Sequence, residues 1–197
     1  MRLFAAIDLD ETARSAAAGS TDAFARRLTR AGARSPVRWV PPEQLHVTLR
    51  FLGEVAAGQV ESARRAFSVP WNTCAFNAGL AGVDVFPFSG APRVIWLGLD
   101  EGREQLVALK SELDHRLVPV GFEPETRPFR AHLTLGRVNR QVAVSGAELR
   151  IMLSAHRPET ARWVVDRVTL YASRLSSRGA THHVVESTRL APSRETS

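Results

Sequence analysis

The sequence predicts a mixed α/β fold of the α+β kind, and two observations lead to this prediction. Segments with the period of amphipathic helices are interspersed with segments in which apolar and polar residues alternate as they do in strands. In addition, the pattern His-x-Thr-Leu occurs twice, at residues 46–49 and 132–135, each time within a strand-like segment. The distance between the two copies favours a duplicated helix-strand unit over a linear array of short repeats.

The first half of the chain alternates strands and helices. The apolar run at 3–9 predicts a strand, and the alanine-rich segment 12–30 predicts a helix that ends at Gly32 and Ser35-Pro36. Residues 38–40 are expected to be extended, and the Pro41-Pro42 turn leads into the first motif strand at 45–52. A helix at 57–67 and strands at 76–86 and 94–99 follow, with the proline-containing loop 87–92 between the two strands.

The second half repeats this alternation. Leucines at 106, 109, 113 and 117 predict a helix over 102–117. The second motif strand is expected near 130–138, followed by a helix from a cap at Ser145 to about Ala155 and by strands at 163–173 and 182–190. No low-complexity linker separates the motif strands. We therefore expect residues 1–197 to form one domain of two interleaved lobes, each carrying one motif, with a cleft between them.

Length and composition fit a globular protein whose core needs neither disulfides nor metals. The chain has 197 residues, 44% of them hydrophobic, and no segment approaches the roughly 18 consecutive apolar residues of a membrane span. Asp8 and Asp10 interrupt the opening apolar run before it reaches the length of a signal-peptide core. The single cysteine, Cys74, cannot form an internal disulfide. We expect a cytoplasmic protein without a membrane segment, acting as a monomer.

The positive charge comes almost entirely from arginine. The formal net charge is +6, and Lys110 is the only lysine among the 26 basic residues. The guanidinium fork of arginine matches phosphate oxygens and stacks on nucleobases. The excess therefore fits a polyanionic partner, and a codon usage that favours arginine throughout the chain explains it equally well. For this reason the placement of arginines near the motifs is more informative than their number.

Strand geometry places the polar residues of each motif together. Because side chains two residues apart share one face of a strand, His46 and Thr48 project together, and so do His132 and Thr134. The opposite face of the first motif strand is apolar and is expected to hold Leu45, Val47, Leu49 and Phe51. Two histidines that face one phosphate can act as general base and general acid without a metal. The threonine hydroxyls can donate hydrogen bonds to phosphate oxygens.

These motifs and their flanks resemble the 2H phosphoesterase superfamily, and within it the RNA 2',3'-cyclic phosphodiesterases, also called 2'-5' RNA ligases. The resemblance extends over nearly the whole chain, at Arg2–Asp8, Arg38–Gly53, Phe86-Pro87, Pro92–Trp96, Gly121-Phe122, Arg127–Arg137 and Leu170–Ser173. It implies a bilobal, pseudo-twofold, LigT-like fold with two antiparallel sheets around a central cleft and helices outside. It also implies hydrolysis of a terminal 2',3'-cyclic phosphate of RNA, as found on tRNA fragments, to a 2'-phosphate, with no metal and no other cofactor.

The resemblance also assigns roles to the motif residues. It implies that His46 donates a proton to the leaving 3'-oxygen, that His132 accepts a proton from water, and that Thr48 and Thr134 hold the phosphate. From the sequence alone the two histidines are equivalent.

Three further residues are candidates for substrate binding. Arg130 precedes His132 by two residues, so the strand period places it on the same face as a phosphate clamp. Arg50 shares the phase of His46 and is either a ligand or a rim residue, and Tyr171 either stacks on a base or packs in the core. We interpret Arg93, Arg127 and Arg137 as rim charges or ion-pair partners. Ala131 departs from the proline expected in many relatives, which bears on local strand geometry more than on chemistry.

The motif histidines also admit a structural role or a metal-binding role. They can be partly buried strand residues, or they can join the His182-His183 pair as zinc ligands, although a zinc site does not require the threonines. We interpret His182 and His183 as surface or edge residues. Alternative functions are 2'-5' ligation of tRNA halves, turnover of a small cyclic phosphate such as an ADP-ribose derivative, and binding of RNA ends without turnover.

Overall fold

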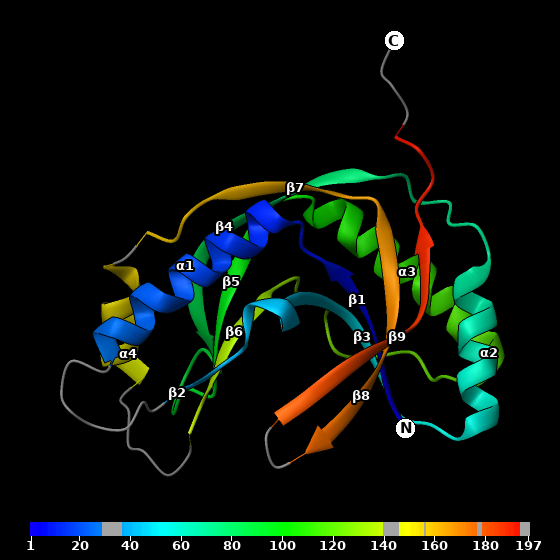
Figure 1. Ribbon diagram of the computed structural model, residues 1–197, viewed down its shortest axis with the longest axis horizontal. Helices are drawn as coiled ribbons and strands as arrows, with labels where there is room; N and C mark the ends of the chain where they lie inside the picture. The colour runs from blue at the N-terminus through cyan, green and yellow to red at the C-terminus, as the bar shows by residue number, and fades with distance from the viewer. Residues whose placement is uncertain (29–36, 140–145, 156, 177–178, 194–197) are drawn as a thin grey trace.

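Nine strands form one curved antiparallel sheet in the computed structural model, which describes residues 1–28, 37–139, 146–155, 157–176 and 179–193 (Figure 1). The strands are β1 (Arg2–Asp8), β2 (Val37–Trp39), β3 (His46–Glu54), β4 (Phe76–Phe86), β5 (Val94–Glu101), β6 (Leu133–Val138), β7 (Ala161–Val165), β8 (Arg167–Ser176) and β9 (Gly179–Arg189). Their order across the sheet is β7-β4-β5-β6-β3-β1-β8-β9, and β2 pairs with β6. The predicted mixed α/β class with antiparallel strands is confirmed.

The sheet consists of two halves that meet at its centre. One half contains β9, β8, β1 and β3, and the other contains β6, β5, β4 and β7. β3 and β6 pair through Val47 and Leu133, so the two antiparallel sheets that the resemblance implies are joined into one. The first half combines strands from both ends of the chain, whereas the second consists of β4 to β7 from its middle, with β2 paired to β6.

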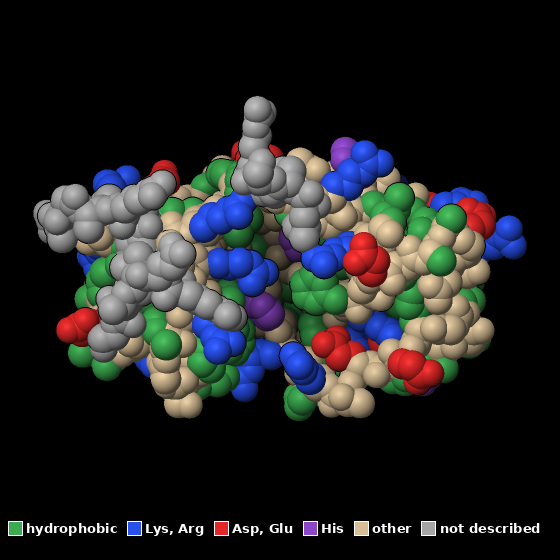
Figure 2. Space-filling view, turned by 90° about the horizontal axis from the view of Figure 1, so that it is seen from below, with side chains coloured by type: hydrophobic (Ala, Val, Ile, Leu, Met, Phe, Trp, Pro, Cys, Tyr) green, Lys and Arg blue, Asp and Glu red, His purple; other side chains and the backbone are tan. Residues whose placement is uncertain are grey.

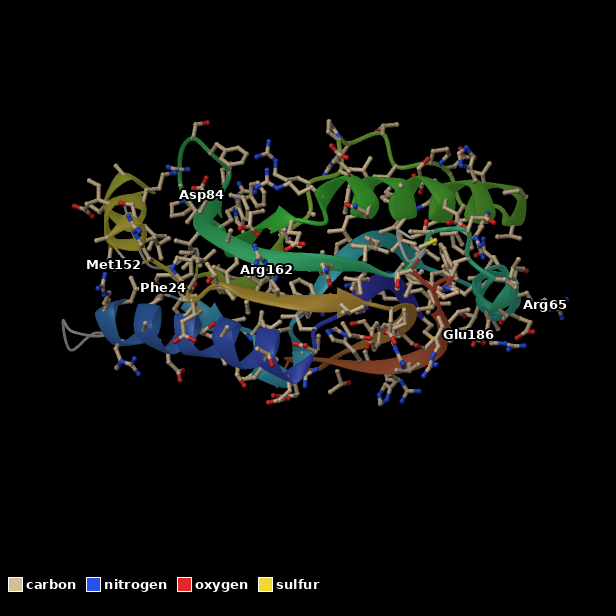
Figure 3. The ribbon with its side chains drawn as sticks, turned by 90° about the horizontal axis from the view of Figure 1, so that it is seen from above. Phe24, Arg65, Asp84, Met152, Arg162 and Glu186 are labelled. Atoms are coloured by element: carbon tan, nitrogen blue, oxygen red, sulfur yellow. The ribbon has the colours of Figure 1, made fainter. Side chains whose placement is uncertain are left out.

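Four α-helices and two 3₁₀ turns accompany the sheet in the described part of the chain. They are α1 (Glu11–Leu28), η1 (Pro42–Gln44), α2 (Ala57–Ser68), α3 (Arg103–Leu117), η2 (Val118–Val120) and α4 (Gly146–Ser154). Figure 3 shows α1 with Phe24 and α4 with Met152 at one end of the molecule, and Glu186 of β9 near α2 at the other. An ion pair of 3.2 Å between Arg64 and Glu186 ties α2 to β9. No helix in the described ranges is long and apolar enough to cross a membrane.

The core lies between the helices and the sheet. The period-2 alternation buries Leu3, Ala5 and Ile7 of β1, and the leucine repeat of α3 buries Leu106 and Leu109 with the rest of its apolar stripe. The helix expected at 102–117 and the strand expected at 76–86 agree with α3 and β4 to within a residue. The cap expected at Ser145 lies outside the described residues.

Two expected strands differ from the structure. The segment 163–173 contains parts of two strands, because β7 ends at Val165 and β8 begins at Arg167, and the carbonyl of Asp166 between them accepts from the amide of Leu190. β6 begins at Leu133 rather than near Arg130. Leu133, its first residue, is the one that pairs with β3, so the residues before it precede the ladder. Arg130 and His132 consequently lie just outside the strand.

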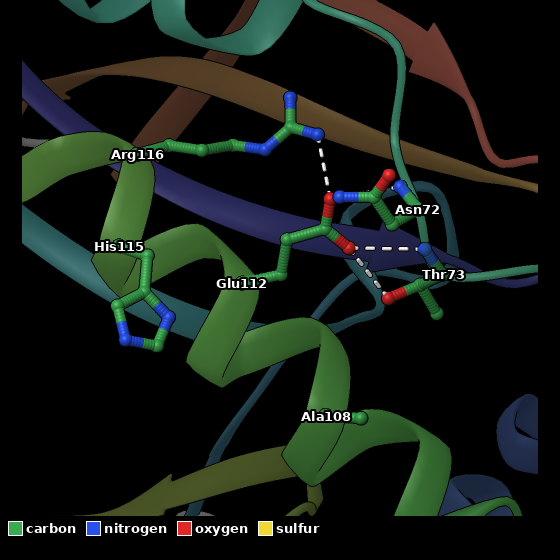
Figure 4. Close-up of a pocket in the computed structure, with 6 residues that line it drawn as sticks. All are labelled: Asn72, Thr73, Ala108, Glu112, His115 and Arg116. Carbon is green, nitrogen blue, oxygen red and sulfur yellow. Dashed lines mark hydrogen bonds and ion pairs between the residues drawn. The ribbon is translucent and has the colours of Figure 1, made fainter.

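A carboxylate on α3 fastens the turn that precedes β4. Glu112 accepts hydrogen bonds from the amides of Asn72 and Thr73, from the Thr73 hydroxyl and from the Arg116 guanidinium (Figure 4). Burial raises the pKa of Glu112, but these hydrogen bonds outweigh it and hold the pKa below its usual value. The stabilisation is therefore complete above the pKa of the unfolded chain and is lost as pH falls through the lower folded-state pKa.

Replacing Glu112 by Gln should lower the free energy of unfolding by about 1–2 kcal/mol at neutral pH, because four exposed or half-buried donor groups lose their charged acceptor. The difference from the parent protein should shrink at about pH 4 and below, where carboxylates become protonated. Urea unfolding at several pH values measures both effects. His115→Ala, an exposed change on the same helix, serves as the control. An equal loss at neutral and acidic pH would contradict the assignment.

Candidate active site

The pairing between β3 and β6 brings the two motifs together. Val47 and Leu133 each follow the histidine of their motif, so the pairing joins equivalent positions of the two copies. In an antiparallel register this places His46 across from Thr134 and Thr48 across from His132. Side chains that face each other in this way have Cβ atoms about 5 Å apart. Each histidine therefore lies beside the threonine of the other motif.

The two imidazole rings are held by the same hydrogen bond. Nδ1 of His46 lies 2.7 Å from the carbonyl oxygen of Gln44, and Nδ1 of His132 lies 2.8 Å from that of Arg130. A carbonyl only accepts, so each Nδ1 carries the proton and donates. This leaves Nε2 of each ring as the atom that exchanges a proton with a ligand. Both copies thus hold the tautomer that a two-histidine acid-base pair requires.

A β-bulge follows each motif and changes which residues face the site. Ala6 pairs with Thr48 but Ala5 pairs with Arg50, so Leu49 is an extra residue in β3. In β6, Trp96 pairs with Thr134 but Ile95 pairs with Gly136, so Leu135 is the extra residue. Such a bulge shifts the alternation of side chains by one. The motif leucine is the extra residue in both copies.

The first bulge turns Arg50 away from the site and Phe51 toward it. The sequence predicted Arg50 as a ligand or a rim residue and Phe51 as a core residue, so the structure corrects both predictions. Phe51 pairs with Phe4 on the face of Thr48 and is 65% exposed, so it is not a core residue. Arg50 is 3% exposed, and it donates to Asp114 at 2.7 Å and to the carbonyls of Phe122 and Glu123. Its guanidinium is therefore a buried structural tie to α3 and not a phosphate ligand.

The second bulge turns Arg137 toward the site. Arg137 pairs with Val94, which shares a face of β5 with Trp96, the partner of Thr134. The positive charge of Arg137 lowers the pKa of both His46 and His132, which places it within electrostatic reach of both rings. In the second copy of the motif, Gly136 occupies the position equivalent to Arg50. A Cβ atom added to Gly136 would lie 2.6 Å from Val37 and 2.8 Å from Trp39. Arg137 is exposed, so its interpretation as a rim charge or ion-pair partner stays a prediction.

Burial is the main electrostatic influence on the two histidines. Burial lowers the pKa of His46 to about 4, with the Gln44 carbonyl and Asp8 acting in the opposite direction and His182 and Arg137 adding to the lowering. Burial also lowers the pKa of His132, and Arg137 adds to it while the Arg130 carbonyl opposes it. Two neighbours act on His46 alone: His182 lowers its pKa, and Asp8 raises it by a smaller amount.

Aromatic rings surround His46 on the β1 side of the site. The ring centroid of Phe4 lies 4.9 Å from that of His46, and Tyr171 stacks on Phe4 at 5.2 Å. The Tyr171 hydroxyl donates to Asp8 at 2.6 Å, so Tyr171 supports the site through Asp8 rather than with a free hydroxyl. Burial and the bond to Asp8 raise the Tyr171 pKa. The hydroxyl is consequently a fixed donor.

His182 lies on the edge strand β9, as expected, and its ring also joins this cluster. Its ring stands edge-on to His46 at 5.5 Å and to Phe4 at 4.9 Å. Its Nδ1 is buried and has no hydrogen-bond partner in the described part of the chain. The pairing of β9 with β8 sets His182 opposite Ser173, on the face of Tyr171. Because side chains alternate along β9, the sequence predicts that only one of His182 and His183 faces the site. It does not predict which of the two does so, since this depends on how β9 pairs with β8.

His132 has its own ring neighbours in the other half. Phe86 and Trp96 lie 5.3 and 5.9 Å from its ring centroid. The guanidinium of Arg130 lies over Phe88 at 4.9 Å, a cation-π contact that positions an exposed arginine beside the site. Arg130 also bonds His132 through its carbonyl. The structure thus keeps Arg130 near His132, although the strand on which that expectation rested begins three residues later.

The surface is hollowed between the two halves. Figure 2 shows histidine side chains within this hollow and basic side chains beside it. A cavity of about 500 Å³ adjoins the His132 side and is lined in part by Trp96, Arg103 and Arg130. Within the described residues no group of three or more His, Cys, Asp or Glu side chains gathers as a metal site.

A curved antiparallel sheet whose halves each bring a His-x-Thr pair to one hollow defines the two-histidine phosphoesterase class. The chain belongs to the 2'-5' RNA ligase superfamily, whose sequence model matches residues 15–176. This confirms the family that the motifs resemble.

Relatives and solved structures agree with this membership. The RNA 2',3'-cyclic phosphodiesterase of Archaeoglobus fulgidus is 38% identical over 144 residues, covering 72% of this chain and 74% of that protein. The protein of the same name from Methanocaldococcus jannaschii is 28% identical over 94% of this chain and 99% of its own length. A Thermus thermophilus structure superimposes with a TM-score of 0.78 at 26% identity, covering 98% of this chain and 100% of that one. Apo Escherichia coli LigT gives a TM-score of 0.70 at 25% identity, covering 96% and 97%.

Because Arg50 is buried and Arg137 faces the site, we expect their replacement to have opposite effects. Arg50→Ala should lower the free energy of unfolding by about 3 kcal/mol, because it empties a buried ion pair, while the folded fraction keeps its turnover. Arg137→Ala should leave the melting temperature within a few degrees of the parent value and lower phosphodiesterase activity. Thermal unfolding and activity per folded molecule measure the two effects. A stable but inactive Arg50→Ala protein would make Arg50 a ligand after all.

Proposed function

We propose that this protein is an RNA 2',3'-cyclic 3'-phosphodiesterase, with residues 1–197 acting as one catalytic domain of two lobes. The observation that carries the proposal is the pair of imidazoles with bonded Nδ1 atoms, each beside the threonine of the other motif. The curated relatives bear the name RNA 2',3'-cyclic phosphodiesterase, which supports the same activity. The substrate is RNA with a terminal 2',3'-cyclic phosphate, for example a tRNA fragment.

The reaction is an in-line displacement at phosphorus. Nε2 of His132 takes a proton from water as the water oxygen bonds to phosphorus, and Nε2–H of His46 gives its proton to the 3'-oxygen as the P–O3' bond breaks. The products are a 2'-phosphomonoester and a free 3'-hydroxyl. His46 ends neutral and His132 ends protonated, and exchange with solvent restores both. The direction of this assignment follows the family resemblance.

The remaining polar groups hold the phosphate. Thr48 and Thr134 donate their hydroxyls to the non-bridging oxygens. Arg137 offsets the negative charge from a position within reach of both histidines. Arg130 stands at the edge of the site beside His132 and attracts the RNA backbone.

Ligation, the same ring opening with another nucleophile, is a second candidate, favoured by the membership in the 2'-5' RNA ligase superfamily. A 5'-hydroxyl would replace water as the nucleophile, and a 2'-5' linkage would form. Water is present in large excess over RNA ends, so hydrolysis should dominate. Incubation with paired tRNA halves, followed by a search for joined product, measures the balance between the two reactions.

Replacing either His46 or His132 by Ala should lower turnover by about 10²- to 10⁴-fold, because each ring transfers one proton. The assay uses an oligonucleotide that ends in a 2',3'-cyclic phosphate and identifies the product as a 2'- or 3'-phosphate. His115→Ala on the outer helix α3 should be unaffected. RNA affinity that survives both substitutions, with no product from the parent protein, would favour a binding module instead.

The lowered pKa values of both histidines predict a displaced pH profile. The value of kcat/KM follows the free enzyme, in which burial lowers the pKa of His46 to about 4 and also lowers that of His132. Its maximum should therefore lie below about pH 6.5, the ordinary pKa of histidine. The negative phosphodiester of the bound substrate raises both pKa values, so kcat should reach its maximum at a higher pH. Steady-state kinetics from about pH 4 to 9 measure both profiles, and coincident maxima near about pH 8 would contradict this account.

A further inference from the structure

An apolar strip crosses four strands on the face that carries His46. Phe51 of β3 pairs with Phe4 of β1, Phe4 pairs with Tyr171 of β8, and Tyr171 pairs with Val184 of β9. Residues that pair directly across a sheet project from the same face. The members of the strip are Phe51, Phe4, Tyr171 and Val184; Phe4 is buried beneath its neighbours.

The two ends of the strip are open to solvent. Phe51 is 65% exposed and Val184 is 61% exposed, whereas their neighbours Leu52 and Val185 pack against the core. The bulge at Leu49 is what directs Phe51 outward. Packing in the core therefore does not explain why the side chains of Phe51 and Val184 are apolar. A phenylalanine exposed beside an active site marks a surface that a ligand can cover.

The strip adjoins the site and is longer than one base. The Phe4 ring lies 4.9 Å from the His46 ring, and the Tyr171 ring lies 6.4 Å from it. Along β1 the strip lies two residues from Ala6, the partner of Thr48, a rise of about 7 Å that a ribose can bridge. From Phe51 to Val184 it spans three strand spacings, about 14 Å.

Aromatic and apolar side chains on a sheet face, next to a phosphate site in a basic protein, suit stacked nucleobases. The net charge of +6 and the position of Arg137 favour an RNA strand over an apolar peptide. Stacking on an aromatic ring tolerates every base, because each base has a π face. An RNA chain that supplies the phosphate to His46 and His132 brings its bases to this strip.

We propose that the strip binds the last two bases of the RNA chain, the terminal base at its Tyr171 end and the preceding base on Phe51. Tyr171 and its neighbour Val184 receive the terminal base because Tyr171 lies within 6.4 Å of the His46 ring. Phe51 reaches the site through Phe4, 6.1 Å away. The enzyme then selects the end of an RNA chain over a free 2',3'-cyclic mononucleotide. This inference rests on the proposed function.

The experiment compares a 2',3'-cyclic mononucleotide with a dinucleotide that ends in the same cyclic phosphate. For the parent protein, kcat/KM should be about 5- to 100-fold higher for the dinucleotide, the range expected for one stacked base. Phe51→Ala should remove most of that preference and leave the mononucleotide value within about threefold. Phe51→Trp should keep the preference, and Phe51→Leu, which is apolar but not planar, should lose it.

Controls separate folding, stacking and the reaction itself. Ile151→Ala removes an equally exposed apolar side chain from α4, 69% exposed, and should change neither substrate. Melting temperatures verify that each variant is folded. Equal kcat/KM for the two substrates, or a preference that survives Phe51→Ala, or an equal loss on both substrates, would overturn the proposal.

A binding measurement keeps the test independent of turnover. Titration with the dinucleotide that carries a 2'-phosphate should show weaker binding to Phe51→Ala by about the same factor as in the kinetic test. If the parent protein hydrolyses neither cyclic substrate, the proposed function is wrong, and this titration still tests whether the strip binds bases. Unchanged affinity in Phe51→Ala would reject it.

Discussion

The pairing of Val47 with Leu133 is the contact on which the active site depends. It joins a four-stranded half and a five-stranded half into one sheet through equivalent residues of a repeated motif. Because a strand alternates its side chains, burying these two residues in the core directs their histidine and threonine neighbours to the other face. The same pairing therefore connects the core, sets the register and assembles the site. His46 and His132 each lie one residue from this pairing.

Sequence periodicity predicted the strands and the His-x-Thr pairs well, because both depend on alternation within a few residues. It failed directly after each motif. The extra residue of each bulge is a leucine, Leu49 or Leu135; no glycine or proline stands beside Leu49, whereas Gly136 directly follows Leu135. Strict alternation consequently placed Arg50 in the site and Phe51 in the core, the reverse of the structure. A comparison of the two copies, in which Phe51 and Arg137 occupy the same position, was the available signal.

Contacts between distant segments were the other part that the sequence did not reveal. His182 approaches His46 because β9 pairs with β8 and β8 with β1, so its position depends on the register of three strands. Likewise, Asp8 differs from other acidic residues because Tyr171 and Thr169 both donate to it. Such a network holds a charge near one histidine and not near the other, and no local pattern in the sequence predicts it.

The equivalence of Phe51 and Arg137 has a consequence for regiochemistry. A cleft with true twofold symmetry would present the same acid, base and hydroxyls to a cyclic phosphate in either of two orientations. Breakage of the P–O2' or the P–O3' bond would then be equally accessible. In this chain one copy of the repeat has Phe51 and the other has Arg137 at the same position, so the two orientations of a cyclic phosphate do not meet the same surroundings. Under the proposed function, this difference is a physical basis on which a symmetric pair of histidines can favour one sense of cleavage.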